Sequence, residues 1–228
     1  MNPYAALLLD LDGTLLDTAP DMGGALNRLR LENGLDPLPP DRIRSVVSHG
    51  AMRLVSLGFP DAQAAEFERL RLRFLDLYAG NIAGQTRMFP GLEPVLEALE
   101  QRDLPWGIVT NKPGWLTHPL LEALGLGRRA ACVVSGDTVA ERKPHPLPLL
   151  HAARLLGVSP AQCLYAGDAE RDVQAGRAAG MTTLVAAYGY LSADDDPLGW
   201  GPTAVIDEPG ELLEWLVPHP ARGAGDRR

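Results

Sequence analysis

Two acidic residues at alternate positions, Asp10 and Asp12, are the first candidates for chemistry in this chain. They end the apolar run Leu7 to Leu9 and precede Gly13, which allows the backbone to turn tightly. Residues two apart in a strand share one face, so the two carboxylates point the same way. Neighbouring carboxylates repel each other unless a cation or a shared proton compensates. The alternative is an acidic strand end at a solvated turn, which is common for Asp-Gly.

Two further polar segments carry a hydroxyl, an amide and an ammonium group. Thr110 and Asn111 follow the apolar run Gly107 to Val109, where they could bind an anion, cap a helix, or do both. Lys143 stands before a proline and, taken alone, is more typical of a solvated surface. None of these residues identifies a site by itself.

A second acidic pair follows the apolar run Tyr165 to Gly167. Asp168 stands at the end of that run, and Asp172 lies four residues on, one turn into an expected helix. Acidic residues also favour the first turn of a helix for electrostatic reasons, so this pair is compatible with simple capping.

The elements that must position these residues are short apolar runs that alternate with helical patterns. The expected strands cover 4–10, 106–110, 131–135, 162–166, 183–187 and 204–206, and the expected helices between them cover 94–101, 115–124, 146–156, 170–179 and 210–216. This alternation predicts an α/β fold with a doubly wound, Rossmann-like parallel sheet.

One interval breaks the alternation. Between Asp17 and Met88 no run reads as a strand, and helical patterns over 21–33, 42–57 and 62–78 are punctuated by prolines. We therefore expect an all-helical cap domain, residues 18–87, inserted after the first strand. The α/β core is expected to comprise 1–17 and 88–217, and the Gly-rich, charged segment 218–228 is expected to be a frayed tail.

In such a sheet the strand ends that carry these polar residues meet at one edge. Asp10, Asp12 and Asp168, with Asp172 one helical turn further on, would then concentrate negative charge there, which requires a hard cation and a positive side chain. Oxygen ligands suit Mg²⁺, Lys143 supplies the compensating charge, and Thr110 offers a donor to a bound oxyanion. The constellation predicts a site that handles phosphoryl groups.

The four motifs, in this order, resemble those of the haloacid dehalogenase superfamily in its phosphatase branch. They are Asp10 to Thr14, Thr110 after its strand, Lys143-Pro144, and Gly167-Asp168 with Asp172, and the similarity extends from Tyr4 to about Asp207. The chain resembles the phosphoglycolate phosphatase type most. Segments 106–113 and 188–190, with Trp200-Gly201, are similar to N-acetylmuramic acid 6-phosphate phosphatases.

The resemblance implies a role for each motif residue. Asp10 would be the nucleophile that forms an aspartyl-phosphate, and Asp12 the general acid and then the general base. Asp10, the backbone carbonyl of Asp12 and Asp168 would bind Mg²⁺, with Asp172 orienting groups around them. Thr110, Asn111 and Lys143 would bind the phosphoryl oxygens. Ala169 departs from the pattern, because many relatives have a polar residue there. The resemblance therefore does not decide whether Asp172 or only Asp168 contacts the metal from this segment.

Substrate specificity is expected to come from the cap. Ser48 to Arg53 form a polar, Gly-containing break in helical sequence, in which His49 and Gly50 could contact the substrate and Arg53 could bind a carboxylate bidentately. A solvated helix start is an equally good interpretation of this segment. The expected substrate is a small carboxylate-bearing ester, either 2-phosphoglycolate or N-acetylmuramic acid 6-phosphate, which the core motifs do not distinguish.

Other functions fit the residues less well. A phosphosugar mutase would use the same core but return the phosphoryl group to a sugar. A non-catalytic phosphometabolite-binding protein would be expected to lack at least one of Asp10, Asp12, Lys143 or Asp168. A dehalogenase has no use for Asp12 or for a metal-binding Asp168.

Composition limits the class of protein further. The 228 residues carry a formal net charge of −8, which argues against a nucleic-acid-binding protein. Cys132 and Cys163 lie in apolar segments and are expected to be buried free thiols. No signal peptide or membrane-length apolar run is recognisable, so we expect a cytoplasmic enzyme without a membrane partner, either a monomer or a homodimer.

Overall fold

The computed structural model describes residues 4–216. Its main sheet has six parallel strands in the order β5-β4-β1-β6-β7-β8. Their bounds are β1 Ala6–Leu9, β4 Trp106–Val109, β5 Cys132–Val134, β6 Cys163–Gly167, β7 Thr182–Ala186 and β8 Ala204–Ile206. The predicted doubly wound parallel sheet is therefore confirmed, and β1 lies in its interior between β4 and β6.

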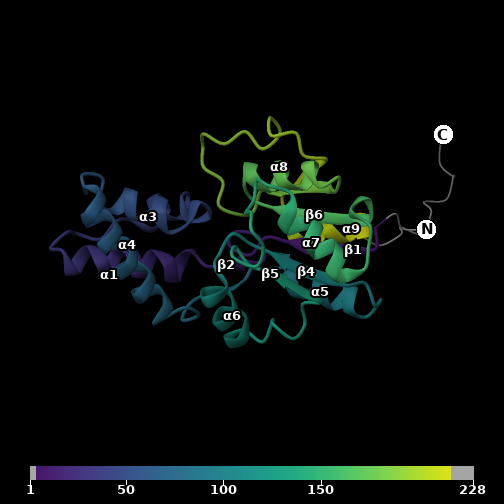
Figure 1. Cartoon of the computed structure of the whole chain (residues 1–228), viewed down its shortest axis with the longest axis horizontal. Coiled ribbons are helices and arrows are strands. Elements are labelled where there is room, and N and C mark those ends of the chain that lie inside the picture. The colour runs from purple at the N-terminus through teal and green to yellow at the C-terminus, as the bar shows by residue number, and fades with distance from the viewer. Residues whose placement is uncertain (1–3, 217–228) are drawn as a thin grey trace, which may run out of the picture.

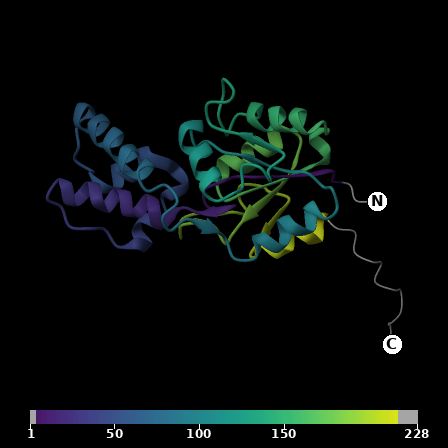
Figure 2. The ribbon, with the colours of Figure 1, turned by 90° about the horizontal axis from the view of Figure 1, so that it is seen from below.

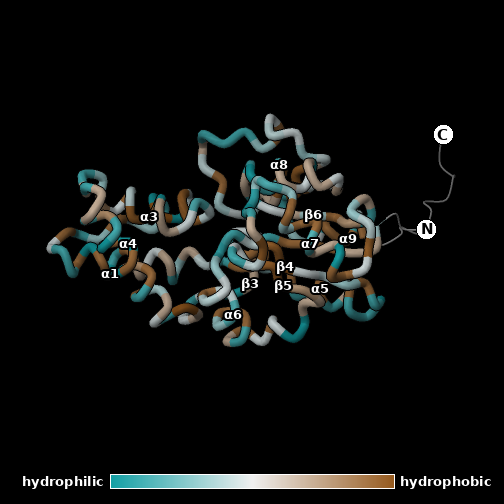
Figure 3. Tube along the Cα trace, in the orientation of Figure 1, coloured by the Kyte–Doolittle hydropathy of each residue, from teal (hydrophilic) through white to brown (hydrophobic). Residues whose placement is uncertain are grey.

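The central strands are apolar throughout because both faces of the sheet are covered. In β1, Leu7 and Leu9 point into one hydrophobic core, whereas Ala6 and Leu8 point into the other. Helices α5 (Leu92–Glu100) and α9 (Leu212–Leu216) pack in the first core, and α7 (Leu147–Leu156) and α8 (Glu170–Ala178) pack in the second, on opposite faces of the sheet (Figure 2). Figure 3 shows hydrophobic stretches concentrated in this layered core.

The remaining elements complete the sheet's connections. Helix α6 spans Gly114–Ala123, and short 3₁₀ turns occur at Pro160–Gln162 (η2) and Pro209–Glu211 (η3). Cys132 and Cys163 are buried free thiols, as expected. Within the described residues, no helix has both the length and the apolar character needed to cross a membrane.

Four helices lie between β2 (Leu16–Asp17) and β3 (Arg87–Met88), and we call them the helical insertion. They are α1 Ala19–Glu32, α2 Pro40–Arg44, α3 Gly50–Gly58 and α4 Ala64–Ala79, with the 3₁₀ turn η1 at Val47–His49. Helix α4 packs against α1 and α3 around Leu26, Leu54 and Phe74. Figure 1 shows the insertion beside the sheet, as expected for a helical cap. The division of the chain into 1–17, 18–87 and 88–217 stays a prediction.

Two details differ from the sequence-based expectations. The stems of the insertion form an antiparallel two-stranded ribbon, β2 with β3, whose strands are too short to produce a hydropathy pattern. The prediction of a single helix over 42–57 is wrong, because the helical path is interrupted between α2 and α3, where Gly50 has φ of 75°. The break brings η1 against the end of the sheet. The predicted tail, 218–228, lies outside the described residues.

Candidate active site

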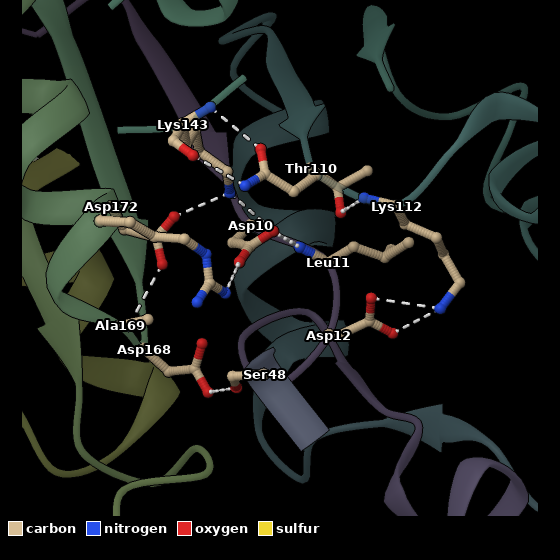
Figure 4. A network of polar contacts seen from close by, with 12 residues as sticks. Asp10, Leu11, Asp12, Ser48, Thr110, Lys112, Lys143, Asp168, Ala169 and Asp172 are labelled. Carbon is tan, nitrogen blue, oxygen red and sulfur yellow. Dashed lines mark hydrogen bonds and ion pairs between the residues drawn. The ribbon is translucent and has the colours of Figure 1, made fainter. Parts of the chain in front are cut away.

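Three buried carboxylates meet at the carboxyl edge of the sheet. Asp10 follows β1, Asp168 follows the neighbouring strand β6, and Asp172 lies in the first turn of α8. Their side chains are almost completely buried, and one oxygen from each lies within 4.8 Å of the others (Figure 4). Of the acids expected to converge, Asp10, Asp168 and Asp172 lie together, whereas Asp12 is not part of this cluster. The cluster sits where the chain switches between the two halves of the sheet.

Lys143 compensates part of this charge. Its side chain is fully buried, and its Nζ lies 2.9 Å from Asp10 Oδ1 and 2.7 Å from Asp172 Oδ1. The same ammonium donates to the carbonyl of Val109 at 2.8 Å and to the hydroxyl of Tyr165 at 2.9 Å. Because four acceptors surround Nζ, the ammonium is fixed against the Asp10 carboxylate rather than free to move with solvent.

Asp172 is committed to partners within the protein. Its Oδ1 accepts from the Tyr165 hydroxyl and pairs with Lys143, and its Oδ2 accepts from the backbone N–H of Ala169. Although burial opposes its charge, Lys143 and Arg171 lower the pKa of Asp172 below its usual value. Asp172 therefore orients Lys143, although its position would also allow it to approach a cation.

The other two carboxylates are less completely satisfied. Burial, opposed by Lys143, raises the pKa of Asp10. Its Oδ1 accepts from the backbone N–H of Leu11 at 2.7 Å, whereas the ion-pair partner of Oδ2 among the described residues is Arg171, at 3.9 Å. Burial and the charges of Asp10 and Asp172 raise the pKa of Asp168 to about 7.

The two oxygens of Asp168 differ in their surroundings. Oδ2 accepts from the Ser48 hydroxyl at 2.6 Å and from the Tyr190 N–H at 3.0 Å. Oδ1 is buried and has no hydrogen-bond partner among the described residues. Gly13 allows this packing, because a Cβ at that position would lie 2.0 Å from Oδ2 and φ there is 85°. A buried anionic oxygen without a donor is a suitable ligand for a cation.

Asp12 has a separate environment. Its carboxylate accepts from the Thr18 hydroxyl at 2.7 Å and from the Nζ of Lys112 at 2.9 and 3.2 Å. Lys112 is only 5% exposed, and its ammonium lies 4.7 Å from the ring centroid of Tyr78 in α4. Although burial opposes the charge, Asp12 and Tyr78 hold the pKa of Lys112 above its usual value.

Lys112 was not predicted to be a site residue, although the rarity of lysine in this chain is a signal that could have identified it. The chain contains only two lysines, Lys112 and Lys143, among many arginines, and both lie in this site. Its partner Asp12 is 100 residues away in sequence, so the pair itself could be recognised only after folding.

Thr110 and Asn111 lie beside these groups, at the end of β4. The Thr110 hydroxyl accepts from the Lys112 N–H at 3.1 Å. The Asn111 side chain accepts from the backbone N–H of Lys143 and donates to the carbonyl of the same residue, at 3.0 and 2.9 Å. Asn111 therefore holds the Lys143 loop with its side chain, and its backbone N–H is a candidate donor to an anion.

A cavity of about 550 Å³ opens onto these residues between the sheet edge and the helical insertion. Asp10, Asp12, Thr110 and Asn111 line it from the core. From the insertion and the later loops it is lined by residues that include Met22, Val47, Ser48, His49, Gly50, Met52, Arg71, Phe74, Leu75, Tyr78, Trp115, Arg142 and Arg171. The cavity is thus polar at the carboxylates and largely apolar on the insertion.

Not all of the insertion residues that were predicted to contact the substrate line the cavity. His49 and Gly50 line the cavity, and burial together with the charge of Arg171 lowers the pKa of His49. Arg53 is exposed and does not line the cavity. Arg71 and Arg171 line it, although neither was predicted from the sequence to be a site residue.

Comparison with known proteins relates this site to a family. A model of the haloacid dehalogenase-like hydrolases matches residues 4–180. The chain is 46% identical over 209 residues to a phosphoglycolate phosphatase of Xanthomonas campestris pv. campestris, with 92% of this chain and 95% of the relative covered. It is 41% identical over 212 residues to an N-acetylmuramic acid 6-phosphate phosphatase of Pseudomonas aeruginosa, with 92% and 94% covered.

Solved structures agree with the fold. A predicted phosphoglycolate phosphatase from Haemophilus somnus superposes with a TM-score of 0.84 at 26% identity, and 94% of this chain and 98% of that chain are covered. A haloacid dehalogenase-like family hydrolase from Streptococcus pneumoniae superposes with a TM-score of 0.80 at 21% identity, with 95% and 100% covered. The second similarity concerns the fold alone.

Proposed function

This chain belongs to the haloacid dehalogenase-like hydrolases and is a phosphatase, and we propose that it hydrolyses a carboxylate-bearing phosphate monoester with Asp10 as nucleophile. The observation that carries the proposal is the contact of the buried Asp10 with Lys143, 2.9 Å away, at the opening of the cavity. An ammonium fixed beside a carboxylate can neutralise an incoming phosphoryl group, which would otherwise be repelled.

The first half of the reaction is an attack by Asp10 on phosphorus. Oδ2 is the attacking atom, because Oδ1 is held by Lys143 and by the N–H of Leu11. The bond from phosphorus to the ester oxygen breaks as the new bond forms, and Asp12, which must enter this step protonated, transfers its proton to the departing alkoxide. Thr110 and the N–H of Asn111 bind phosphoryl oxygens at the end of β4.

The second half regenerates the enzyme. Asp12, which has given up its proton, removes one from a water molecule, and that water attacks the phosphorus of the aspartyl-phosphate. The bond between phosphorus and Asp10 breaks, so Asp10 returns as a carboxylate and inorganic phosphate leaves.

The site also fits a divalent cation. The buried Oδ1 of Asp168 has no hydrogen-bond partner among the described residues, and it belongs to a cluster of acidic oxygens. We propose that Asp10, Asp168 and the backbone carbonyl of Asp12 hold Mg²⁺, with Asp172 committed to Lys143. When bound, the ion supplies positive charge that offsets the charge on the transferring phosphoryl group.

The test is phosphate release with Mg²⁺ from 2-phosphoglycolate, N-acetylmuramic acid 6-phosphate, common hexose phosphates and a nucleoside monophosphate. We expect one of the two carboxylate-bearing esters to have the highest kcat/KM. Asp10→Asn should lower that kcat/KM at least about 1,000-fold, because it removes the nucleophile, while circular dichroism shows an intact fold. Turnover that survives this change would exclude Asp10 as nucleophile.

The same assay separates the alternatives. A phosphosugar mutase would yield an isomerised sugar phosphate with little free phosphate, as ³¹P NMR would show. A binding protein would bind an ester without releasing phosphate from any of them.

A further inference from the structure

One face of α4 lines the cavity. Arg71, Phe74, Leu75 and Tyr78 all line it, and their spacing places them on the same side of an α-helix. Tyr78 marks the catalytic end, because its ring contacts the ammonium that binds Asp12. Seven residues at 1.5 Å each place the backbone of Arg71 about 10 Å from that of Tyr78 along the helix.

Arg71 is held in place by its own helix. Its Nε and Nη2 donate to the two carboxylate oxygens of Glu68 at 2.8 and 2.6 Å, and the side chain is 27% exposed. The remaining N–H groups of the guanidinium make no hydrogen bond within the described part of the chain. A guanidinium fixed along one edge and open along another can receive a second carboxylate without further ordering.

Two of the other cations that line the cavity lie against the catalytic carboxylates, because Lys112 binds Asp12 and Arg171 lies 3.9 Å from Asp10. The third, Arg142, donates through Nε to the carbonyl of Gly136. Of the lysines and arginines in the described residues that line the cavity, Arg71 alone comes from the helical insertion. The cavity therefore has a cationic group well separated from the phosphoryl site.

We propose that Arg71 binds the carboxylate of the substrate at the end of the cavity remote from Asp10. The substrate is then an ester whose phosphate and carboxylate lie on opposite sides of a sugar ring, such as a hexose 6-phosphate with an acidic ether substituent. This assignment rests on the proposed function and narrows its substrate class.

The separation of the two charged groups disfavours the smaller candidate. In 2-phosphoglycolate only the ester oxygen and one methylene separate phosphorus from the carboxyl carbon, a span of about 4 Å from bonds of about 1.5 Å. This span is well short of the about 10 Å that separate Arg71 from Tyr78 along the helix, which favours a longer ester. The apolar side chains of Phe74 and Leu75, between Arg71 and Tyr78, fit the ring and acyl carbons of a larger ester.

The test compares two substrates that differ in one group. N-acetylmuramic acid 6-phosphate is N-acetylglucosamine 6-phosphate with a lactyl ether added, so the ratio of their kcat/KM values isolates the carboxylate. We expect the wild type to prefer the muramic ester. Arg71→Gln should lower this ratio about 10- to 100-fold, the range of a charge-assisted hydrogen bond, mainly by raising KM for the muramic ester.

Three further measurements control the experiment. Arg71→Gln should lose far less activity on N-acetylglucosamine 6-phosphate than on the muramic ester, and circular dichroism reports whether its fold is intact. Arg71→Lys should recover part of the ratio, because it keeps the charge without the planar fork. Arg69→Gln, two positions away on an exposed part of α4 and paired with Glu66, should leave the ratio unchanged.

Several results would overturn the proposal. The first is a wild-type enzyme whose kcat/KM values for the two sugar phosphates are equal, or which turns over neither. The second is an Arg71→Gln variant in which both kcat/KM values fall equally. The third is a loss of 2-phosphoglycolate turnover in Arg71→Gln that is as large as the loss for the muramic ester. Failure of the proposed function is recognised separately, because the wild type would then release no phosphate even from p-nitrophenyl phosphate.

Discussion

At the scale of single residues, the four carboxylates of the site divide into two groups with different cations. Asp10 and Asp172 share Lys143, with Asp168 beside them, whereas Asp12 pairs with Lys112 and with the Thr18 hydroxyl. The proposed mechanism needs such a division, because the nucleophile must stay bound to one cation while the acid and base group exchanges partners with the substrate.

We predict that Lys112 positions Asp12 for proton transfer. Lys112→Met keeps much of the side-chain volume but removes the ammonium, so kcat for an alkyl phosphate should fall about 10- to 100-fold, which is less than the roughly 100- to 10,000-fold that general acid–base catalysis itself supplies. The first turnover of p-nitrophenyl phosphate, measured as a burst, should be affected much less, because that leaving group needs little protonation.

The conservative variant distinguishes positioning from packing. Lys112→Arg keeps the charge next to Asp12 and should recover part of the alkyl phosphate activity. The prediction would be contradicted if the burst rate of p-nitrophenyl phosphate fell as much as kcat for the alkyl phosphate. Lys112 would then act in the attack on phosphorus rather than in proton transfer.

The acidic residues of the site could be predicted from the sequence because each follows an apolar run that ends at the same sheet edge. Lys112 could not be paired with Asp12, nor Ser48 with Asp168, because these contacts join distant segments through side chains. Arg53 and Arg71 illustrate the same limit. Both belong to the helical insertion, and only the packing of α3 and α4 determines which of them lines the cavity.

At the scale of elements, the helical insertion is joined to the sheet by two stems that a single carboxylate connects. Asp21 in α1 is buried and accepts hydrogen bonds from the backbone N–H groups of Gln85 and Thr86, from the Thr86 hydroxyl and from the Asn81 side chain. The outgoing stem is thereby held against the returning one next to the β2–β3 ribbon.

We predict that Asp21→Ala lowers the free energy of unfolding by about 2–4 kcal/mol, because several buried donors lose a charged acceptor at once. Chemical denaturation followed by circular dichroism measures this change. Asp41→Ala, in the first turn of α2 and exposed, is the matched control and should change stability by less than about 0.5 kcal/mol. Equal effects of the two substitutions would show that the stems are held by other contacts.

The long, buried elements were predictable from the sequence, and the short ones were not. The strands of the sheet give apolar runs because both of their faces are covered. The two-residue strands β2 and β3 leave no such signature, and the residues around η1 continue a helical pattern although the chain breaks there. Their conformation depends on what they meet at the sheet edge, which is a tertiary effect.

At the scale of the whole molecule, the cavity exists because the insertion rests on the sheet edge. Among the contacts that join the insertion to the core, Ser48 of η1 donates to Asp168, and Tyr78 of α4 lies against Lys112. Hence the same contacts that enclose the substrate cavity also touch the residues proposed to bind the metal and to orient Asp12. An arrangement of this kind can exclude bulk water while the phosphoryl group is on the enzyme.

The hydrogen bond from Ser48 to Asp168 joins the helical insertion to the carboxylates of the core. Ser48→Ala removes a hydrogen bond between the insertion and a carboxylate of the core, while Asp168 Oδ2 keeps the Tyr190 N–H. If the contact stabilises the closed form by about 1 kcal/mol, KM for the preferred ester should rise about five-fold, because less of the protein is competent to bind.

The kinetic parameters separate closure from chemistry. At saturating Mg²⁺, kcat should stay within about two-fold of the wild type, because the closed complex that forms is unchanged in its reacting groups. Ser45→Ala is the control in the same segment, since within the described residues the Ser45 hydroxyl donates only to the carbonyl of Arg42 in α2, and it should leave both parameters unchanged. A fall in kcat at constant KM would instead mean that Ser48 acts on the reacting groups through Asp168, so that the insertion would contribute to the chemistry and not only to enclosure.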